Sequence, residues 1–210
     1  MIEDRGIKVI LLGEAGVGKT NLIRVAMGKK FEKNVDTTIS SAFYGSKIDY
    51  NEKTYQYCLW DTAGQEVYRS LNKIFIKDSK IIIIVFSIIN RDSFTNIDFW
   101  INYVKEILEE DSYIMAIVGN KIDLYDEQQI PDNEIEKKIK DLGLKSKITS
   151  AATDAQGFRK FLNELLKEYI NKYIDKSNPQ ENPISNSFTI IQSKHKKKKE
   201  KEKKKSKCCF

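Results

Sequence analysis

The sequence, 210 residues long, predicts an α/β fold with a mostly parallel six-stranded sheet, one antiparallel edge strand, and helices on both faces. Two observations predict this fold. Short apolar runs that suit strands alternate along the chain with segments of helical periodicity, which is typical of a parallel sheet covered on both faces. Near residue 50, two strand-like runs are separated by only three residues, and a connection that short makes the pair an antiparallel hairpin.

Six segments have the composition of strands. The run over residues 81–86 is apolar and almost entirely β-branched, as expected for a strand buried on both faces. The two strands of the hairpin are joined at Asn51, Glu52 and Lys53. The expected strands are residues 8–12, 42–50, 54–60, 81–86 and 113–118, followed by a short one that ends at Ile148.

Three segments have helical character, and one has none. The first helix follows a glycine-rich segment and continues to about Met27. The second helix, over residues 92–108, has an apolar face made of Phe94, Ile97, Ile101, Val104 and Leu108. The third, over residues 155–174, has an apolar stripe made of Phe158, Phe161, Leu162, Leu165, Leu166, Tyr169, Ile170 and Tyr173. Residues 31–42 are polar and lack periodicity, so we expect a long loop there.

The end of the chain differs in composition from the rest. Residues 176–210 contain eleven lysines and three glutamates, which gives this part a net charge of +8. Since the whole chain has a net charge of +6, residues 1–175 have a net charge of −2. The same residues show no core-forming pattern. We therefore expect a folded domain over residues 1–175 and a disordered, lysine-rich tail over residues 176–210.

Cysteine usage and hydropathy restrict the compartment. Three cysteines, with Cys58 alone and two adjacent near the end, make no disulfide framework and suit a reducing compartment. The N-terminus lacks the basic start and cleavage site of a signal peptide. The longest apolar run is too short to span a bilayer. We therefore expect the protein in the cytosol or on a cytosolic membrane face.

Residues 13–20 read GEAGVGKT, which fits the phosphate-loop pattern G-x-x-x-x-G-K-[ST]. Glycines let successive backbone N–H groups point at phosphate oxygens, and the following helix presents its positive end. Lys19 would neutralise the β- and γ-phosphates, and Thr20 would offer its hydroxyl to Mg²⁺. A glycine-rich turn that binds nothing is the alternative, but the motif stands between a strand and a helix, as it must. The predicted contacts are Gly13, Ala15, Gly16, Val17, Gly18, Lys19, Thr20 and Asn21.

Residues 120–123 read NKID and follow a buried strand, at the edge of the sheet where ligands bind in this architecture. The Asp123 carboxylate can accept hydrogen bonds from the N1–H and amino groups of guanine, whereas adenine offers neither. Such sites discriminate by roughly 10⁴. Alone, the string would suit an ordinary polar turn, but about 100 residues after a phosphate loop it predicts a guanine site. The predicted base contacts are Asn120, Lys121 and Asp123.

Residues 60–66 read WDTAGQE. Asp61 ends a strand beside the phosphate loop and is suited to hold Mg²⁺ through a water. The backbone of Gly64 can approach the γ-phosphate, and Gln65 can orient the attacking water as the catalytic residue. A tight turn after a strand would explain the glycine but not the whole string.

These three strings, in this order, resemble the Ras superfamily of small GTPases over about residues 7–174. The resemblance implies the P-loop GTPase fold, with GTP or GDP and Mg²⁺ bound. It implies that Thr38 reaches Mg²⁺ when the γ-phosphate is present, and that Phe31 packs on the guanine base. Ser150 and Ala151 fall in the last guanine element. The next residue is alanine where the family usually has lysine.

Within the superfamily the chain resembles a divergent Rab. Residues 38–43 read TISSAF, close to the Rab string T-I-G-x-x-F, and residues 68–71 and 90–94 are also similar to Rabs. Residues 75–79 and Ser87 depart from the Rab pattern, and these departures concern partner recognition and not the nucleotide site. The resemblance implies a GTP-hydrolysing switch in vesicle trafficking. Its expected partners are an exchange factor, a GTPase-activating protein, effectors, a prenylation escort and a GDP-dissociation inhibitor. It implies a monomer that cycles between cytosol and the cytoplasmic face of an intracellular membrane.

The chain ends with Cys208, Cys209 and Phe210. A C-a-a-X box needs cysteine at the fourth position from the end, which is Lys207 here. The cysteine pair resembles the double prenylation signal of Rabs, and lysines add attraction to an anionic leaflet. A solvated tail, a nuclear localisation signal and nucleic-acid binding are the alternatives. Interspersed glutamates and missing aromatic residues argue against nucleic acid, so we expect a lipid anchor and no nucleic-acid partner.

Two other functions compete with the hydrolysing switch. A GTP-binding scaffold with little hydrolysis is suggested by Ala15, which stands where Ras has glycine. Rabs often carry serine or another residue at that position. A soluble nuclear-transport GTPase of the Ran kind would end in acidic residues without cysteines, the opposite of this tail.

Overall fold

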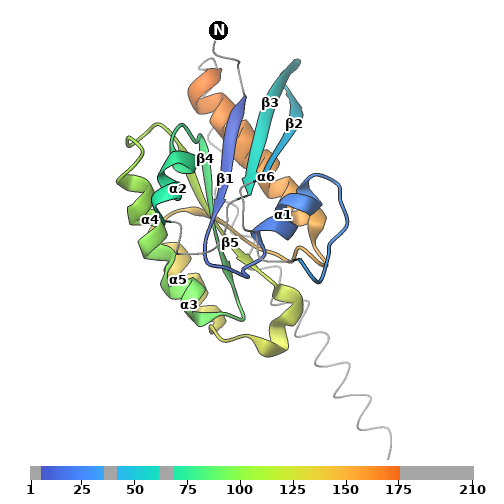
Figure 1. Ribbon diagram of the computed structural model, residues 1–210, viewed down its shortest axis with the longest axis vertical. Helices are drawn as coiled ribbons and strands as arrows, with labels where there is room; N and C mark the ends of the chain where they lie inside the picture. The colour runs from blue at the N-terminus through green and yellow to red at the C-terminus, as the bar shows by residue number, and fades with distance from the viewer. Residues whose placement is uncertain (1–5, 36–41, 62–68, 176–210) are drawn as a thin grey trace, which may run out of the picture.

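The computed structural model describes residues 6–35, 42–61 and 69–175, with only the backbone of residues 69–72 (Figure 1). Within these residues the sheet has six strands in the order β2-β3-β1-β4-β5-β6. Neighbouring strands are parallel except β2 and β3, so the antiparallel strand lies at the edge. The expected fold class is confirmed. The strands are β1 (Ile7–Leu12), β2 (Ala42–Tyr50), β3 (Lys53–Asp61), β4 (Ile81–Ser87), β5 (Ile114–Asn120) and β6 (Lys145–Ile148).

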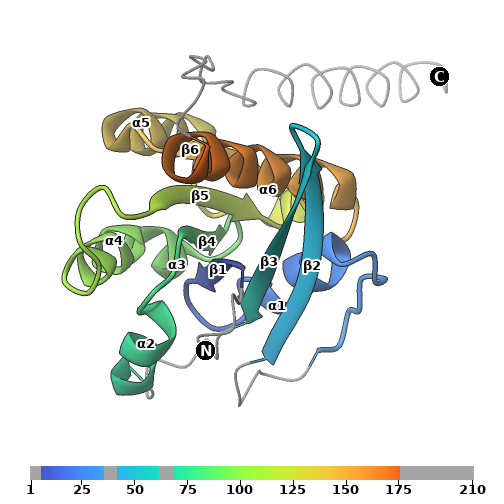
Figure 2. The ribbon, with the colours of Figure 1, turned by 90° about the horizontal axis from the view of Figure 1, so that it is seen from above.

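Helices cover both faces of the sheet because its central strands are apolar on both sides. In β1, Val9 and Leu11 pack toward α1 and α6, whereas Ile10 and Leu12 pack toward the helices of the opposite face. Figure 2 shows α1 and α6 next to each other, with α3 and α4 across the sheet from them. The helices are α1 (Lys19–Ala26), α2 (Arg69–Ile76), α3 (Arg91–Thr95), α4 (Ile97–Lys105), α5 (Asp132–Leu142) and α6 (Ala155–Tyr169).

The structure corrects several expected boundaries. The single helix expected over residues 92–108 is divided into α3 and α4 at Asn96, where ψ is 2°. Backbone hydrogen bonds continue on both sides of this residue, so the apolar face keeps its period across the break. The helix expected over residues 155–174 ends in a π-helix, Ile170–Ile174. Helices α2 and α5, and a 3-10 helix over Ile122–Glu127, have no counterpart among the expected elements.

The last described residue is held against the β2–β3 hairpin. Asp175 accepts a hydrogen bond from the Tyr55 hydroxyl at 2.5 Å and forms an ion pair with Lys53 at 2.9 Å. Nearby, the Asn171 amide donates to the Tyr50 hydroxyl at 2.9 Å. The π-helix Ile170–Ile174 and the hairpin turn therefore lie together, at the top of Figure 1, away from the loop that follows β1.

Candidate functional site

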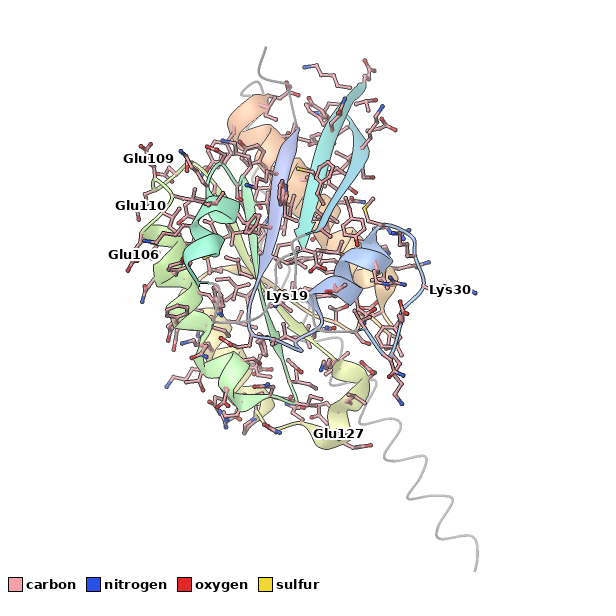
Figure 3. All side chains as sticks on the ribbon, in the orientation of Figure 1. Lys19, Lys30, Glu106, Glu109, Glu110 and Glu127 are labelled. Carbon is pink, nitrogen blue, oxygen red and sulfur yellow. The ribbon has the colours of Figure 1, made fainter. Side chains whose placement is uncertain are left out.

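The predicted motifs meet at one edge of the sheet. The loop after β1, the end of β3 and the end of β5 converge there because the carboxyl ends of parallel strands share an edge. Figure 3 labels Lys19 at this edge, where α1 begins. The structure thus brings together the phosphate loop, Asp61 and the segment that begins at Asn120, which lie far apart in the sequence.

The phosphate loop has a backbone that requires glycine at two positions. Gly13 has φ of 140°, and a Cβ there would lie 2.1 Å from the carbonyl oxygen of Val85. Gly18 has φ of 97°, and a Cβ there would lie 2.4 Å from the amide nitrogen of Asn120. Gly18 also precedes α1 without a side-chain cap. The first N–H groups of α1 are therefore available for an anion, as in phosphate sites at helix N-termini.

Lys19 is nearly buried, with 6% of its surface exposed. Its ammonium donates to the carbonyl oxygens of Gly13 at 2.7 Å and Glu14 at 2.9 Å, so it holds the loop in its curled form. Burial lowers the pKa of Lys19 to about 8, against the opposing attraction of Asp61 and Glu14. The ammonium is therefore mostly charged at neutral pH, and an anionic ligand would favour that charge further.

Asp61 and Thr20 fit a magnesium ion. Asp61 is buried, at 1% exposure, and burial raises its pKa, while a hydrogen bond from Thr20 and the charge of Lys19 lower it. Its Oδ1 has no hydrogen-bond partner among the described residues. A buried carboxylate oxygen in this state is suited to a cation or its bound water, and hydroxyl and carboxylate oxygens are the ligands that Mg²⁺ prefers. The ion would neutralise phosphate charge there.

Asn120 joins the two parts of the site, which are the phosphate loop and the segment after β6. It ends β5 rather than following it, and its side chain is 2% exposed. Its amide nitrogen donates to the carbonyl oxygen of Val17 at 2.8 Å, and its amide oxygen accepts from the N–H of Ala151 at 3.1 Å. Asn120 therefore ties the phosphate loop to the segment after β6, although sequence reasoning placed both Asn120 and Ala151 only at the base.

Asp123 is exposed at the start of the 3-10 helix and is oriented by a serine. The Ser150 hydroxyl donates to Asp123 Oδ1 at 2.5 Å, and the same oxygen of Ser150 accepts the N–H groups of Ala152 and Thr153. Lys121, just before, takes the left-handed conformation, and burial lowers its pKa. The contact between Ser150 and Asp123 gives Ser150 a positioning role that no local sequence pattern indicated.

The segment that carries Phe31 is fastened to α1. The Asn21 side chain donates to the carbonyl oxygen of Glu32 at 2.9 Å and accepts its N–H at 3.1 Å, while Arg24 forms an ion pair with Glu32 at 2.6 Å. Phe31 is 42% exposed, so its ring is free to pack on a ligand. Asn21, expected as a nucleotide contact, therefore uses its side chain to position this segment.

Some expected site residues lie outside the described part of the chain. They are Thr38, Gly64, Gln65, Cys208 and Cys209. Their roles stay predictions from the sequence. The remaining expected residues all lie on the loop, on α1 or beside it, or at the carboxyl ends of β3, β5 and β6.

A comparison with protein-family models gives one match. The model described as Ras family matches residues 8–171, which is most of the 210-residue chain. Proteins of this family generally bind GTP or GDP with Mg²⁺, hydrolyse GTP, and interact with exchange factors, GTPase-activating proteins and effectors. The phosphate loop, the buried Asp61 and the exposed Asp123 supply the parts that these activities need. The chain belongs to the Ras family and is a small GTPase.

Proposed function

We propose that this small GTPase is a Rab-like switch, which hydrolyses GTP and recruits effectors to a membrane in vesicle traffic. One observation favours a partner surface beside the nucleotide site. Phe43, Trp60 and Phe75 form a continuous aromatic row across β2, β3 and α2, with ring centroids 5.8 Å and 5.9 Å apart. Phe43 is 60% exposed, and exposed aromatic residues are typical of binding hot spots.

Along the chain, the aromatic row adjoins the two segments that should respond to the nucleotide. Phe43 follows residues 36–41, which contain Thr38, and Trp60 precedes residues 62–68, which contain Gln65. The row is therefore adjacent in the sequence to both segments. Phe43 belongs to the Rab-like string at residues 38–43, which supports the Rab assignment over other branches of the family.

The proposed chemistry is attack of water on the γ-phosphate. Lys19 and the loop N–H groups stabilise the charge that develops on the phosphate oxygens, and Gln65 orients the water. Asp61, Thr20 and Thr38 would hold Mg²⁺. We expect slow intrinsic turnover, and an activating protein that supplies further positive charge to the transition state would accelerate it.

Gln65→Leu is expected to keep nucleotide affinity and to slow single-turnover GTP hydrolysis by at least about tenfold, because the side chain touches the water and not the bound phosphates. Hydrolysis is measured on preloaded GTP, with and without cell extract. If the Gln65→Leu variant hydrolysed GTP at the wild-type rate, Gln65 would not be the residue that orients the water. A wild-type protein that binds GTP but hydrolyses none, even with extract, would instead favour the scaffold suggested by Ala15.

The tail is proposed to attach the protein to the cytosolic face of a membrane. Among the described residues, no helix has the length and apolar character needed to cross a bilayer. The proposed attachment is through prenyl groups on Cys208 and Cys209, aided by lysines that are attracted to anionic lipids. The prenylation escort and the GDP-dissociation inhibitor are the partners that such a tail requires.

Replacing Cys208 and Cys209 by serine is expected to make the protein mostly soluble at physiological salt. The lysines remain, but their attraction is screened over roughly 8 Å under these conditions. The measurement is membrane fractionation from cells, alongside sedimentation with anionic vesicles over a salt series. Retention of the double-serine form on membranes after a high-salt wash would contradict the lipid anchor, and its accumulation in nuclei would favour a localisation signal.

A further inference from the structure

Glu14, an unassigned position of the phosphate loop, is held by α4 and the residue before it. Its Oε1 accepts a hydrogen bond from the Asn96 amide at 3.0 Å and from the Trp100 indole N–H at 3.2 Å. Trp100 is 5% exposed and packs edge-on against Phe99, so its N–H needs a protein acceptor. Glu14 supplies that acceptor from the loop, 86 residues away in sequence.

The backbone of Glu14 is held as well. Its carbonyl oxygen accepts from the Lys19 ammonium at 2.9 Å, the same group that binds the Gly13 carbonyl. The next two residues, Ala15 and Gly16, are exposed. Glu14 is therefore the point at which the loop is attached both to its own lysine and to a helix across the site.

We propose that Glu14 is a positioning residue, which fixes the phosphate loop against α4 through Asn96 and Trp100 and so slows nucleotide release. The loop binds phosphate by converging its N–H groups, and a loop already held in place loses less freedom on binding. The inference rests on guanine-nucleotide binding at this loop. It assigns the effect to the hydrogen bonds of the carboxylate, because its negative charge alone would repel phosphate.

The test is the dissociation rate of a fluorescent GDP analogue from the full-length, Mg²⁺-loaded protein. Glu14→Ala is expected to release the analogue about tenfold faster, the loss of roughly one charge-assisted hydrogen bond. Asn96→Ala and Trp100→Phe, which each remove one donor, are expected to release it several-fold faster. Glu14→Gln keeps an acceptor oxygen and is expected to stay within about twofold of wild type. The double variant Glu14→Ala, Trp100→Phe should match Glu14→Ala.

Glu134→Ala is the matched control, because it removes a carboxylate that pairs with Arg91 at the surface, away from the loop. It should leave the release rate unchanged whatever its effect on thermal stability. The inference would be overturned if Glu14→Ala and Asn96→Ala released the GDP analogue at the wild-type rate. It would also be overturned if Glu14→Gln released the analogue as fast as Glu14→Ala does. If Glu14→Ala does not fold, the release rates of Asn96→Ala and Glu14→Gln test the inference, the first expected to be several-fold faster than wild type and the second within about twofold of it. A wild-type protein that retains no GDP would instead overturn nucleotide binding itself.

Discussion

Asp123→Asn is expected to shift base preference from guanine toward xanthine by about 10³-fold or more. In the predicted base site the carboxylate would accept from two guanine donors, whereas an amide offers one donor in place of an acceptor. Xanthine carries a carbonyl where guanine carries its amino group, so the pairing with asparagine is restored. The Ser150 hydroxyl, which donates to the Asp123 carboxylate, can donate equally to the oxygen of an amide at this position and so orient it.

The measurement is competition between GTP and XTP for the protein. Asp126→Asn is the matched control, because Asp126 is an exposed aspartate in the same 3-10 helix and should change nothing. Ser150→Ala should lower guanine affinity without creating xanthine preference, since it frees the carboxylate but keeps its chemistry. An Asp123→Asn protein that still prefers GTP would remove Asp123 from the base site.

Asn120→Ala is expected to speed GDP release by about a hundredfold. The change leaves the Val17 carbonyl and the Ala151 N–H without their partner, at a cost of about 1–3 kcal/mol for each buried group. Because these groups belong to the phosphate loop and the base segment, the two halves of the site would separate from each other. The measurement is the release rate of a fluorescent GDP analogue, together with thermal unfolding.

Asn90→Ala separates this effect from a general loss of stability. Asn90 accepts the Ser93 N–H at 2.9 Å as the N-cap of α3, so its loss should cost about 1 kcal/mol without touching the site. Both variants should unfold at lower temperature, and only Asn120→Ala should release GDP quickly. Equal release rates for the two would show that Asn120 acts only on the fold.

The strands at the centre of the sheet were predictable because apolar runs such as residues 81–86 leave little alternative. Helix α5 was not, because its sequence, DNEIEKKIKDL, is mostly charged and Ile135 is its one fully buried residue. The division between α3 and α4 was hidden for a different reason. Backbone hydrogen bonds persist around Asn96, so the apolar period that indicates a helix runs through the break.

In the candidate site, local patterns predicted the residues of the loop but not the contacts that hold them. The glycine spacing and Lys19 are visible within eight consecutive residues. The contact of Asn120 with Val17 joins residues 103 apart, and that of Ser150 with Asp123 joins residues 27 apart. Such partners are chosen by the packing of the sheet, which no short string contains.

The contacts of Asp175 place the end of the described chain at the pole of the molecule opposite to the nucleotide site. Tyr55 and Lys53 hold this residue at the beginning of β3, whereas Asp61 ends the same strand in the nucleotide site. Eight steps of a strand separate Lys53 from Asp61 by roughly 26 Å. Any chain that continues from Asp175 therefore starts at the pole opposite to the nucleotide. A sensor chip or a bead coupled through that end would leave the nucleotide site facing the solution, whereas coupling through the Lys29–Lys30 region beside α1 would crowd it.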